Sequence, residues 1–350
     1  MKLADMMRNK IRVQGKSRKT FETYWHWCEK YVRWLRKPSG EWVHPRDAGR
    51  VEIERWLTHL ATRERVAKTT QNVALQSVLY LYKQVLGIQI ENVSAMRARR
   101  PETIRDVISV EEVAALFEQL DGVNLLAAQL MYATGLRIGD LVALRIQDVS
   151  FERRQITVHS SKGDKSRRVS FPDVIHEAVA RQIQSCRVLH AWDCEGNNPN
   201  GVSLPGAFRR KSPRAAASFA WFYLFPSDNL SRGEEEVLCR HHRDGDAVTK
   251  QIRYAAARAG IDKRVTSHVL RHCFATHSHE MGVPMRTLQQ LLGHSDIRTT
   301  EIYVHADVNG ATAAPSPLER LLASPRPQVE PPRPEPVTLR VVRAEARRTG

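Results

Sequence analysis

Residues 267–277 read SHVLRHCFATH and residues 291–305 read LLGHSDIRTTEIYVH, and these two stretches decide how the C-terminal half of the chain is interpreted. His268 and Arg271 are three residues apart, so a helix turns both side chains to the same face. His294 follows a glycine, just ahead of the segment that carries Tyr303. The pattern predicts helices near 267–281, 284–292 and 295–304. These helices and the turn at His294 together supply a phenol, a guanidinium and two imidazoles.

Two upstream segments complete the set. Arg137 lies in TGLRIGDL, and Lys162 lies in SSKGDKSRRV. Residues 154–160 and 166–171 alternate apolar and polar side chains, which predicts a β-hairpin with Lys162 near its tip. Lys165 lies on the same hairpin and is the alternative lysine. No cluster of metal-binding carboxylates accompanies these residues, and the combination is typical of metal-free attack on a phosphodiester.

Breaking a phosphodiester without metal or water sets clear chemical demands. The phenol of Tyr303 can attack phosphorus and conserve the bond energy in a covalent phosphotyrosine. Charge on the non-bridging oxygens requires preorganised donors, and the guanidinium forks of Arg137 and Arg271 can form that clamp. Lys162 can donate a proton to the leaving 5′ oxygen, and His294 can hydrogen-bond a non-bridging oxygen. We therefore expect no metal and no cofactor.

The segments TGLRIGDL, SHVLRHCFATH and LLGHSDIRTTEIYVH resemble the signature segments of the tyrosine recombinase family. The resemblance covers most of residues 1–305. It implies that Tyr303 is the nucleophile and that the assisting catalytic residues are Arg137, Lys162, His268, Arg271 and His294. It also implies site-specific DNA recombination through 3′-phosphotyrosine intermediates, carried out by a tetramer assembled on DNA.

The net charge of +16 is unevenly distributed along the 350 residues. Residues 1–100 carry 21 Lys and Arg against 9 Asp and Glu, whereas the remaining 250 residues carry 33 against 29. A strongly basic N-terminal region predicts a polyanionic partner. Nucleic acid is the usual partner, and an anionic membrane surface is the alternative.

Three features predict a cytoplasmic protein with no membrane partner. No apolar run approaches the ~20 residues needed to span a bilayer. The first residues, MKLADMMRNKIRVQGK, lack the apolar core of a signal peptide. The five cysteines are odd in number and lack the spacing of a disulfide framework, as expected in a reducing compartment.

The chain is expected to contain a DNA-binding domain, a linker, a catalytic domain and a tail. The ranges are 1–87 for a helical core-binding domain, 88–107 for the linker, 108–323 for the catalytic domain and 324–350 for a disordered Pro-rich tail. The basic run at 97–101 can lie against phosphates or be a solvated charge run. The expected fold class is mainly α with a small β-sheet, in which a helical domain and an α/β catalytic domain form a C-shaped clamp on DNA.

Helical spacing and capping signals predict most of the elements. In the first domain, helices are expected from the N-cap Ser17 to about Lys37 and over 50–64 and 68–86. In the second, a capping box at Ser109 and Glu112 precedes helices expected at 109–120, 123–133, from Gly139, from Pro172 to about Trp192 and at 247–259. The tryptophans of the first helix can stack on bases, but such aromatic stripes more often pack in a core; they are Trp25, Trp27 and Trp34.

An insert at about 193–245 separates the hairpin from the His268 helix. Its stretch GVSLPGAFRRKSPRAAASFAWFYLFPS, followed by LCRHH, resembles the extra segment that marks integron integrases. That resemblance implies two DNA partners, a duplex attachment site and a folded single-strand cassette site whose extruded bases the insert grips. Trp221 can provide a stacking platform, and His241 and His242 can provide polar edges.

Several alternatives remain open at this point. The run Phe219–Phe225 can be a buried strand, and Cys239 with the two histidines can suggest zinc. Residues 228–236 are expected to form a compact acidic loop. A Xer- or phage-type recombinase acting only on duplex sites and a type IB topoisomerase share this chemistry. A DNA-binding protein that has lost catalysis is the rival from another class. A short helix at 317–323 can pack in trans against a neighbouring chain.

Overall fold

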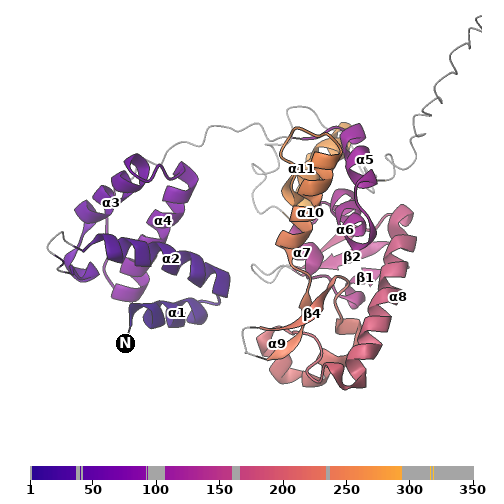
Figure 1. Cartoon of the computed structure of the whole chain (residues 1–350), viewed down its shortest axis with the longest axis horizontal. Helices are drawn as coiled ribbons and strands as arrows, with labels where there is room; N and C mark the ends of the chain where they lie inside the picture. The colour runs from indigo at the N-terminus through magenta and orange to yellow at the C-terminus, as the bar shows by residue number, and fades with distance from the viewer. Residues whose placement is uncertain are drawn as a thin grey trace, which may run out of the picture. The chain divides into compact units, whose positions relative to one another are not determined.

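The computed structural model describes residues 2–36, 40, 42–91, 93, 107–159, 166–233, 237–293, 316 and 318. The chain divides into two compact units, Met1–Ile104 and Arg105–Gly350, each with its own hydrophobic core. Both units are mainly helical, and the second carries small β-sheets, which confirms the expected fold class (Figure 1). Among the described residues, no helix has the length and apolar character needed to cross a membrane.

The first unit is a small helical bundle. Its helices are α1 (Leu3–Val13), α2 (Arg18–Trp34), α3 (Arg50–Thr62) and α4 (Lys68–Tyr80), and α4 continues as a π-helical turn over Leu81–Leu86. α2 begins where the sequence predicts, because the Ser17 hydroxyl accepts the Thr20 N–H at 3.3 Å. α1 is not predicted by the sequence, since it is mostly polar and is held by the burial of Met7 and Ile11.

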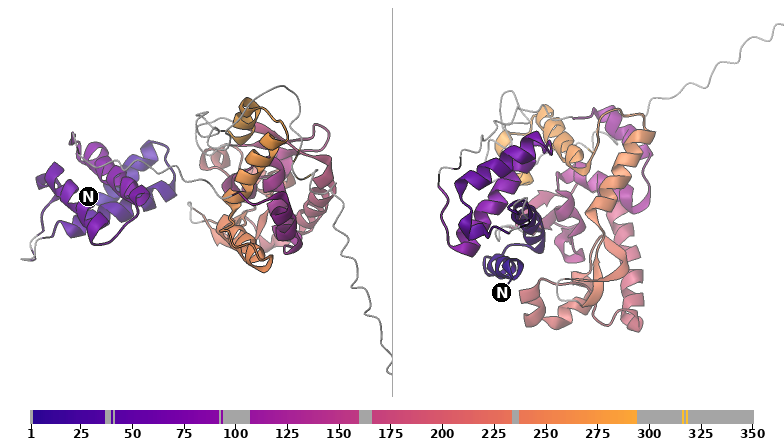
Figure 2. Two further views of the ribbon diagram at one scale, coloured as in Figure 1. Left: turned by 90° about the horizontal axis from the view of Figure 1, so that it is seen from above. Right: turned by 60° about the vertical axis from the view of Figure 1, so that its left-hand side comes forward.

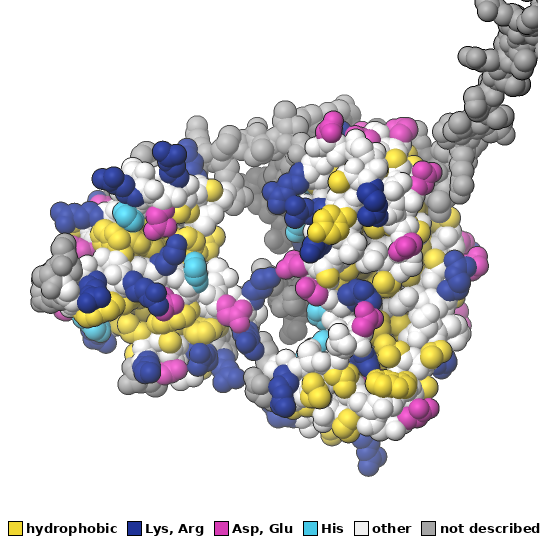
Figure 3. All heavy atoms as spheres, viewed as in Figure 1, with side chains coloured by type: hydrophobic (Ala, Val, Ile, Leu, Met, Phe, Trp, Pro, Cys, Tyr) yellow, Lys and Arg dark blue, Asp and Glu magenta, His cyan; other side chains and the backbone are white. Residues whose placement is uncertain are grey.

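The aromatic residues of α2 belong to the core of this unit. Trp27 and Tyr31 are buried, and Tyr31 packs edge-on against Trp56 with ring centres 5.1 Å apart. Trp25 and Trp34 are partly buried against the same cluster. Lys and Arg side chains lie across the visible surface of the unit (Figure 3). The prediction that the tryptophans pack in the core is therefore confirmed. The cationic groups of this unit are the Lys and Arg side chains at its surface.

The second unit packs helices around a small antiparallel sheet (Figure 2). Its helices are α5 (Val110–Glu118), α6 (Gly122–Thr134), α7 (Ile138–Val142), α8 (His176–Trp192), α9 (Gly206–Lys211), α10 (Gly245–Arg258), α11 (Ser267–Glu280) and α12 (Met285–Leu292). The sheet contains β1 (Val149–Ser150), β2 (Gln155–Val158) and β3 (Arg167–Ser170) in that order. The predicted capping box opens α5, because the Ser109 and Glu112 side chains each accept the other's backbone N–H.

The predicted hairpin is present as the pair β2 and β3. Ile156 faces Val169 across the ladder, and both side chains are buried in the main core. α6 is apolar on nearly all sides and lies in the middle of that core, with α11 packed against it. β1 is not predicted, because two residues are too few to show an alternating pattern.

The insert forms a subdomain with its own hairpin. β4 (Pro226–Arg232) pairs antiparallel with β5 (Leu238–His242), so the prediction of a compact loop at 228–236 is wrong for residues 228–232. The strand is held by cross-strand pairing in spite of a polar sequence that shows no alternation. Phe222 and Phe225 are buried, as the core interpretation of the apolar run expects. The run itself starts as a 3-10 turn at Phe219–Trp221.

Several predicted features lie outside the described residues. They are the helix at 295–304, most of the linker at 88–107, the tail at 324–350 and the acidic residues 234–236. Within the segment after α12, Leu318 is described and is completely buried in the core of its own unit.

Candidate active site

Arg137 is placed by a tight corner between two helices. α6 ends at Thr134, and Gly135 takes the left-handed conformation, at φ +64°, that closes the helix. A Cβ at Gly135 would lie 2.4 Å from the Phe274 ring on α11, so the corner has room only for glycine. Arg137 is the N-cap of α7, and 41% of its side chain is exposed. The guanidinium thus lies at the surface on a backbone fixed by close packing.

Arg271 reaches the same corner from α11. Its side chain is buried and donates hydrogen bonds to Gly135 O and to Leu292 O, the latter at 2.7 Å. Gly135 lies two residues before Arg137, and Leu292 is the last residue of α12, two residues before His294 in the chain. Because backbone carbonyls fix this guanidinium, its position is set before any substrate arrives.

His268 lies on the first turn of α11 and is exposed. The start of the helix is anchored by Ser267, whose hydroxyl is 3.0 Å from the Thr249 hydroxyl on α10. His268 and Arg271 therefore lie on one helix, as predicted, with the imidazole at the surface and the guanidinium inside. The remaining predicted catalytic residues, Lys162, His294 and Tyr303, lie outside the described residues.

The strands on either side of the Lys162 segment are tied together at their base. His159 Nε2 is 3.0 Å from Asp148 Oδ1, and its Nδ1 is 3.2 Å from Ser166 Oγ. Asp148 is buried and also accepts the backbone N–H of Arg145 at 2.8 Å. These bonds fix the residues from which the predicted hairpin tip extends.

Asp140 connects Arg137 to this hairpin. Its carboxylate accepts a hydrogen bond from Arg167 Nη2 at 2.8 Å and lies 3.9 Å from Arg137 Nη1. Arg167 is the first residue of β3, and its Nε also donates to Leu291 O at 3.1 Å. The sequence interpretation missed both Asp140 and Arg167. Asp140 could have been found from the sequence, because it lies three residues after Arg137 at the start of a helix, where the two side chains can meet.

Trp221 belongs to an aromatic stack already formed inside the insert. Its ring stacks on Phe208 of α9, with ring centres 4.3 Å apart and planes 24° apart. The Arg145 guanidinium lies 5.2 Å from the Trp221 ring centre and 4.2 Å from that of Tyr223. Burial lowers the pKa of Arg145, and its Nη2 donates to Ser203 O at 2.8 Å and to the Tyr223 hydroxyl at 3.0 Å. Trp221 is therefore half-buried and fixed in orientation by protein contacts.

His241 and His242 are neighbours on β5, so their side chains point to opposite faces of the hairpin. His242 packs edge-on against Tyr223, with ring centres 5.4 Å apart, and Tyr223 in turn contacts Arg145, the cation beside Trp221. His241 Nε2 is 3.4 Å from Cys239 Sγ, and burial, with His242 as the second cause, lowers the pKa of His241. The structure thus links His242 to Trp221 only indirectly, through Tyr223 and Arg145, and places His241 on the other face of β5.

The zinc interpretation of Cys239 and the two histidines requires a set of converging ligands. In the part of the chain that the structure describes, no three His, Cys, Asp or Glu side chains gather as such a set. His242 Nδ1 instead lies 2.8 Å from the backbone carbonyl of Arg243. We therefore assign Cys239 and His241 to the packing of β5.

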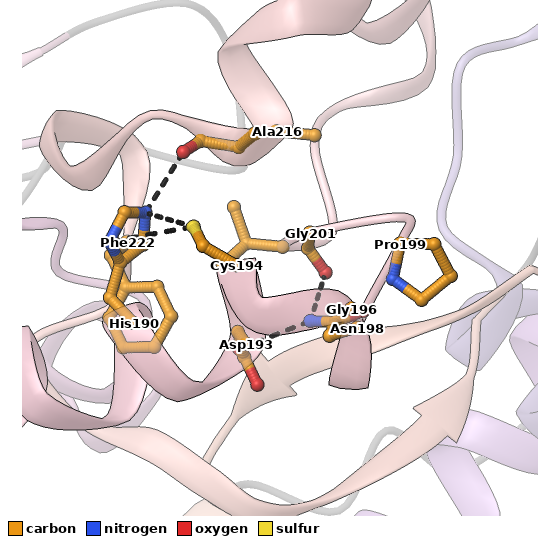
Figure 4. Close-up of a pocket in the computed structure, with 11 residues that line it drawn as sticks. His190, Asp193, Cys194, Gly196, Asn198, Pro199, Gly201, Ala216 and Phe222 are labelled. Carbon is orange, nitrogen blue, oxygen red and sulfur yellow. Dashed lines mark hydrogen bonds between the residues drawn. The ribbon is translucent and has the colours of Figure 1, made fainter.

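A cavity of about 180 Å³ lies where α8 meets the insert (Figure 4). Phe222, Val202 and Ala216 give it apolar walls, and His190 and Cys194 also line it. None of the predicted catalytic or base-contacting side chains that the structure describes lines this space. It belongs to the packing of the insert on the end of α8.

Comparison with known proteins agrees with this geometry. Residues 106–309 match the model of the phage integrase family, and residues 3–92 match the N-terminal SAM-like domain of phage integrases. An "Integrase/recombinase" from Escherichia coli is 34% identical and covers 92% of this chain and 94% of its own length. Tyrosine recombinase XerA from Pyrococcus furiosus is 27% identical over 84% of this chain and 85% of its own.

Two solved structures show that the fold is shared. The XerH recombinase bound to a palindromic difH substrate aligns with a TM-score of 0.56 at 18% identity, over 86% of this chain and 80% of its own. A lambda integrase dimer bound to a core site aligns with a TM-score of 0.55 at 15% identity, over 85% and 92%. The family match over most of the second unit, with the recombinases among the relatives, favours a recombinase over a topoisomerase or a non-catalytic protein. The chain belongs to the phage integrase family and is a tyrosine recombinase, an enzyme that cleaves and rejoins DNA strands.

Proposed function

We propose that this tyrosine recombinase is an integron integrase, which inserts and excises gene cassettes. Its partners would be a duplex attachment site and a folded single-strand cassette site with extruded bases. The observation that carries the proposal is the insert at about 193–245, which builds a separate subdomain between β3 and α11. Such a subdomain adds a surface that the cutting chemistry itself does not require.

In the proposed reaction, the Tyr303 phenolate attacks phosphorus and forms a 3′-phosphotyrosine bond while the bond to the 5′ oxygen breaks. Lys162 supplies the proton that the 5′ oxygen takes as it leaves. Arg137 and Arg271 neutralise the charge on the non-bridging oxygens. The buried, carbonyl-held Arg271 supports this assignment, because preorganised donors need no reorientation during the reaction. Rejoining reverses the same steps, so the bond energy is conserved.

The remaining imidazoles complete the proposed site. His268 is exposed on the first turn of α11, where it can hydrogen-bond a phosphate oxygen beside Arg271. His294 follows Gly293, the C-cap of α12, whose last carbonyl is the acceptor for Arg271. His268 therefore lies on α11, the helix that carries Arg271, and His294 follows α12, whose Leu292 carbonyl binds Arg271.

The contacts of the insert refine how it would hold an extruded base. His242 contacts Tyr223, and Tyr223 and Trp221 both contact Arg145, whereas His241 lies on the other face of β5. We therefore propose that Trp221 and His242 contact the same extruded base. His241 would instead stabilise the β4–β5 hairpin or contact a different base. Because Phe208 and Arg145 fix the Trp221 ring, a base would meet a rigid surface, which lowers the entropic cost of binding.

One specific observation favours the alternative, a Xer- or phage-type recombinase that acts only on duplex sites. Trp221 is engaged with Phe208 and Arg145 within its own subdomain, as a residue with a purely structural role would be. The chain also aligns along most of its length with tyrosine recombinases named Xer. Both functions use the same catalytic residues and differ in the substrate that the insert accepts.

Replacing Trp221 with alanine separates the two functions. Adduct formation on a nicked hairpin substrate with extruded bases is expected to fall about 10-fold or more, since stacking of one base on an aromatic ring contributes about 1–3 kcal/mol. On the matching perfect duplex the rate is expected to stay within about twofold of wild type. The measurement is covalent trapping on both substrates, resolved on a denaturing gel.

Trp192→Ala is the matched control for this experiment. Trp192 is an exposed tryptophan at the end of α8, so it tests the same chemical change away from the Phe208 stack. An equal loss on hairpin and duplex in Trp221→Ala would favour the duplex-only enzyme with a structural insert. Adduct on the duplex alone in the wild-type chain would lead to the same conclusion.

We also propose that the enzyme acts as a tetramer on DNA and that the segment near Leu318 joins neighbouring chains. Leu318 is completely buried in its own unit, beside Leu126 of α6 and Val174, where these residues line a cavity of about 570 Å³. A site that accepts Leu318 from its own chain can equally accept it from a neighbour. This supports exchange of the segment in the assembly.

A chain truncated after Gly310 is expected to bind a single site normally but to lose synaptic complexes. The physical reason is that Leu318, the apolar residue that would occupy the neighbour's site, has been removed. Native gels with one-site and two-site DNA measure both properties. Leu318→Asp in the full chain serves as the point variant, and unchanged assembly in both proteins would refute the exchange.

A further inference from the structure

Arg167 lies where three elements of the catalytic unit meet. It is the first residue of β3, five residues after Lys162 in the chain, and only 13% of its side chain is exposed. Its Nη2 donates to Asp140 Oδ2 on α7 at 2.8 Å, and its Nε donates to Leu291 O on α12 at 3.1 Å. One planar guanidinium thus connects β3, the start of α7 and the end of α12.

The first of these contacts affects Arg137 through a shared carboxylate. Asp140 is 14% exposed, and Arg167 occupies the close position on it at 2.8 Å, while Arg137 stays at 3.9 Å. A carboxylate with so little access to water requires a cationic partner. With Arg167 present, that requirement is met and the Arg137 fork is available to a phosphate. Without Arg167, Asp140 would draw Arg137 into a closer pair and away from the substrate.

The second contact holds the last turn of α12. Carbonyls at a helix C-terminus lack partners within the helix and carry the negative end of its dipole. Here Leu291 O accepts from Arg167 and Leu292 O accepts from Arg271, so two arginines grip adjacent carbonyls. Gly293, at φ +64°, completes the cap, and a Cβ there would lie 3.0 Å from Arg167 Cδ. Arg167 therefore packs directly against the residue that precedes His294.

We propose that Arg167 is a positioning residue for DNA cleavage, which keeps Arg137 available to the scissile phosphate by neutralising Asp140. This inference rests on the proposed phosphate contact of Arg137. The arginine fork is required, since a single ammonium cannot serve the Asp140 carboxylate and the Leu291 carbonyl in the same geometry.

The test is single-turnover adduct formation on a nicked duplex at saturating DNA, with Arg167→Ala and Arg167→Lys compared with wild type. We expect about a 100-fold loss for alanine and about a 10-fold loss for lysine, which keeps the charge but not the fork. DNA affinity is expected to change less than about threefold. Arg168→Ala is the matched control, because Arg168 is exposed and is the next residue on the same strand.

A second substrate distinguishes positioning from a general loss of structure. Replacing one non-bridging oxygen of the scissile phosphate by a methyl group removes the charge that Arg137 is proposed to neutralise. If Arg167 acts through Arg137, the ratio of wild-type to Arg167→Ala rates should fall from about 100-fold to below about 10-fold on this neutral substrate. If Arg167→Ala only destabilised the protein, its cleavage rate would fall by the same factor on both substrates.

The outcomes separate this inference from the proposed site. If Arg137→Ala removes cleavage but Arg167→Ala behaves like Arg168→Ala, the inference about Arg167 is wrong and the site stands. If Arg137→Ala itself has no effect, the phosphate contact of Arg137 is wrong. A thermal unfolding curve for each variant identifies any that fail to fold, and Arg167→Lys then provides the informative comparison.

Discussion

Tyr303→Phe is expected to abolish the covalent protein–DNA adduct while DNA binding stays at the wild-type level. Phenylalanine keeps the ring and removes only the oxygen that attacks phosphorus, so the substrate site is preserved and the reaction loses its nucleophile. Loss of a covalent nucleophile lowers the rate by at least about 10⁴-fold in enzymes whose catalytic groups act as a unit. Trapping on a nicked suicide substrate and a gel shift on the same DNA measure the two properties.

Tyr254→Phe is the control for this change. Tyr254 is half exposed on α10, beside Lys250 Nζ at 5.6 Å from its ring centre, and it belongs to none of the predicted catalytic motifs. Adduct formation in this variant should match wild type. Adduct in the Tyr303→Phe protein would instead assign the nucleophile to another residue, and the proposed reaction would have to be rebuilt around it.

Arg240→Met is expected to unfold the insert locally, at a cost of about 3–5 kcal/mol, because it leaves a buried carboxylate without its cation. Arg240 and Asp193 are 1% and 4% exposed, and Arg240 Nε donates to Asp193 Oδ2 at 2.6 Å. Arg240 Nη1 also donates to Ser227 O at 2.7 Å, so the same side chain holds β4. Hydrogen exchange of the β4 and β5 amides, with thermal unfolding of the whole chain, measures the loss.

Asp228→Asn provides the matched control in the same hairpin. Asp228 is 78% exposed and bonds Arg243 Nη2 at 3.0 Å, so breaking this pair should cost less than about 1 kcal/mol. The double change Asp193→Leu with Arg240→Met should recover most of the lost stability, since an apolar pair can replace a buried ion pair. If the single variant is as stable as Asp228→Asn, the buried pair does not hold the insert.

The family could be recognised from sequence because its signature segments restrict several positions to one or two residue types in a fixed order. Helical spacing also gave α2, α6, α8 and α11 to within a few residues. The contacts that hold the site could not be predicted in the same way. Arg271 bonds the Gly135 carbonyl across 136 positions, and no local pattern reports a bond between such distant residues.

The insert shows where local patterns fail. β4 reads PSDNLSR and becomes a strand only because β5 pairs with it, so neither alternation nor propensity reveals it. Arg240 is the central residue of LCRHH, and its complete burial depends on Asp193, which lies 47 positions earlier. Sequence reasoning places such a charged residue at the surface, because burial of an arginine is tolerated only with a partner.

The Asp193–Arg240 pair also bears on how such a segment can be acquired. Asp193 directly follows α8, and Arg240 lies on β5, which leads back towards α10. The two ends of the insert, 47 positions apart in sequence, are therefore in contact. A segment whose ends meet can be gained, lost or exchanged with little change in the spacing of the flanking helices. Under the function proposed for the insert, this architecture would allow the accepted DNA shape to change while the spacing of the flanking helices is kept.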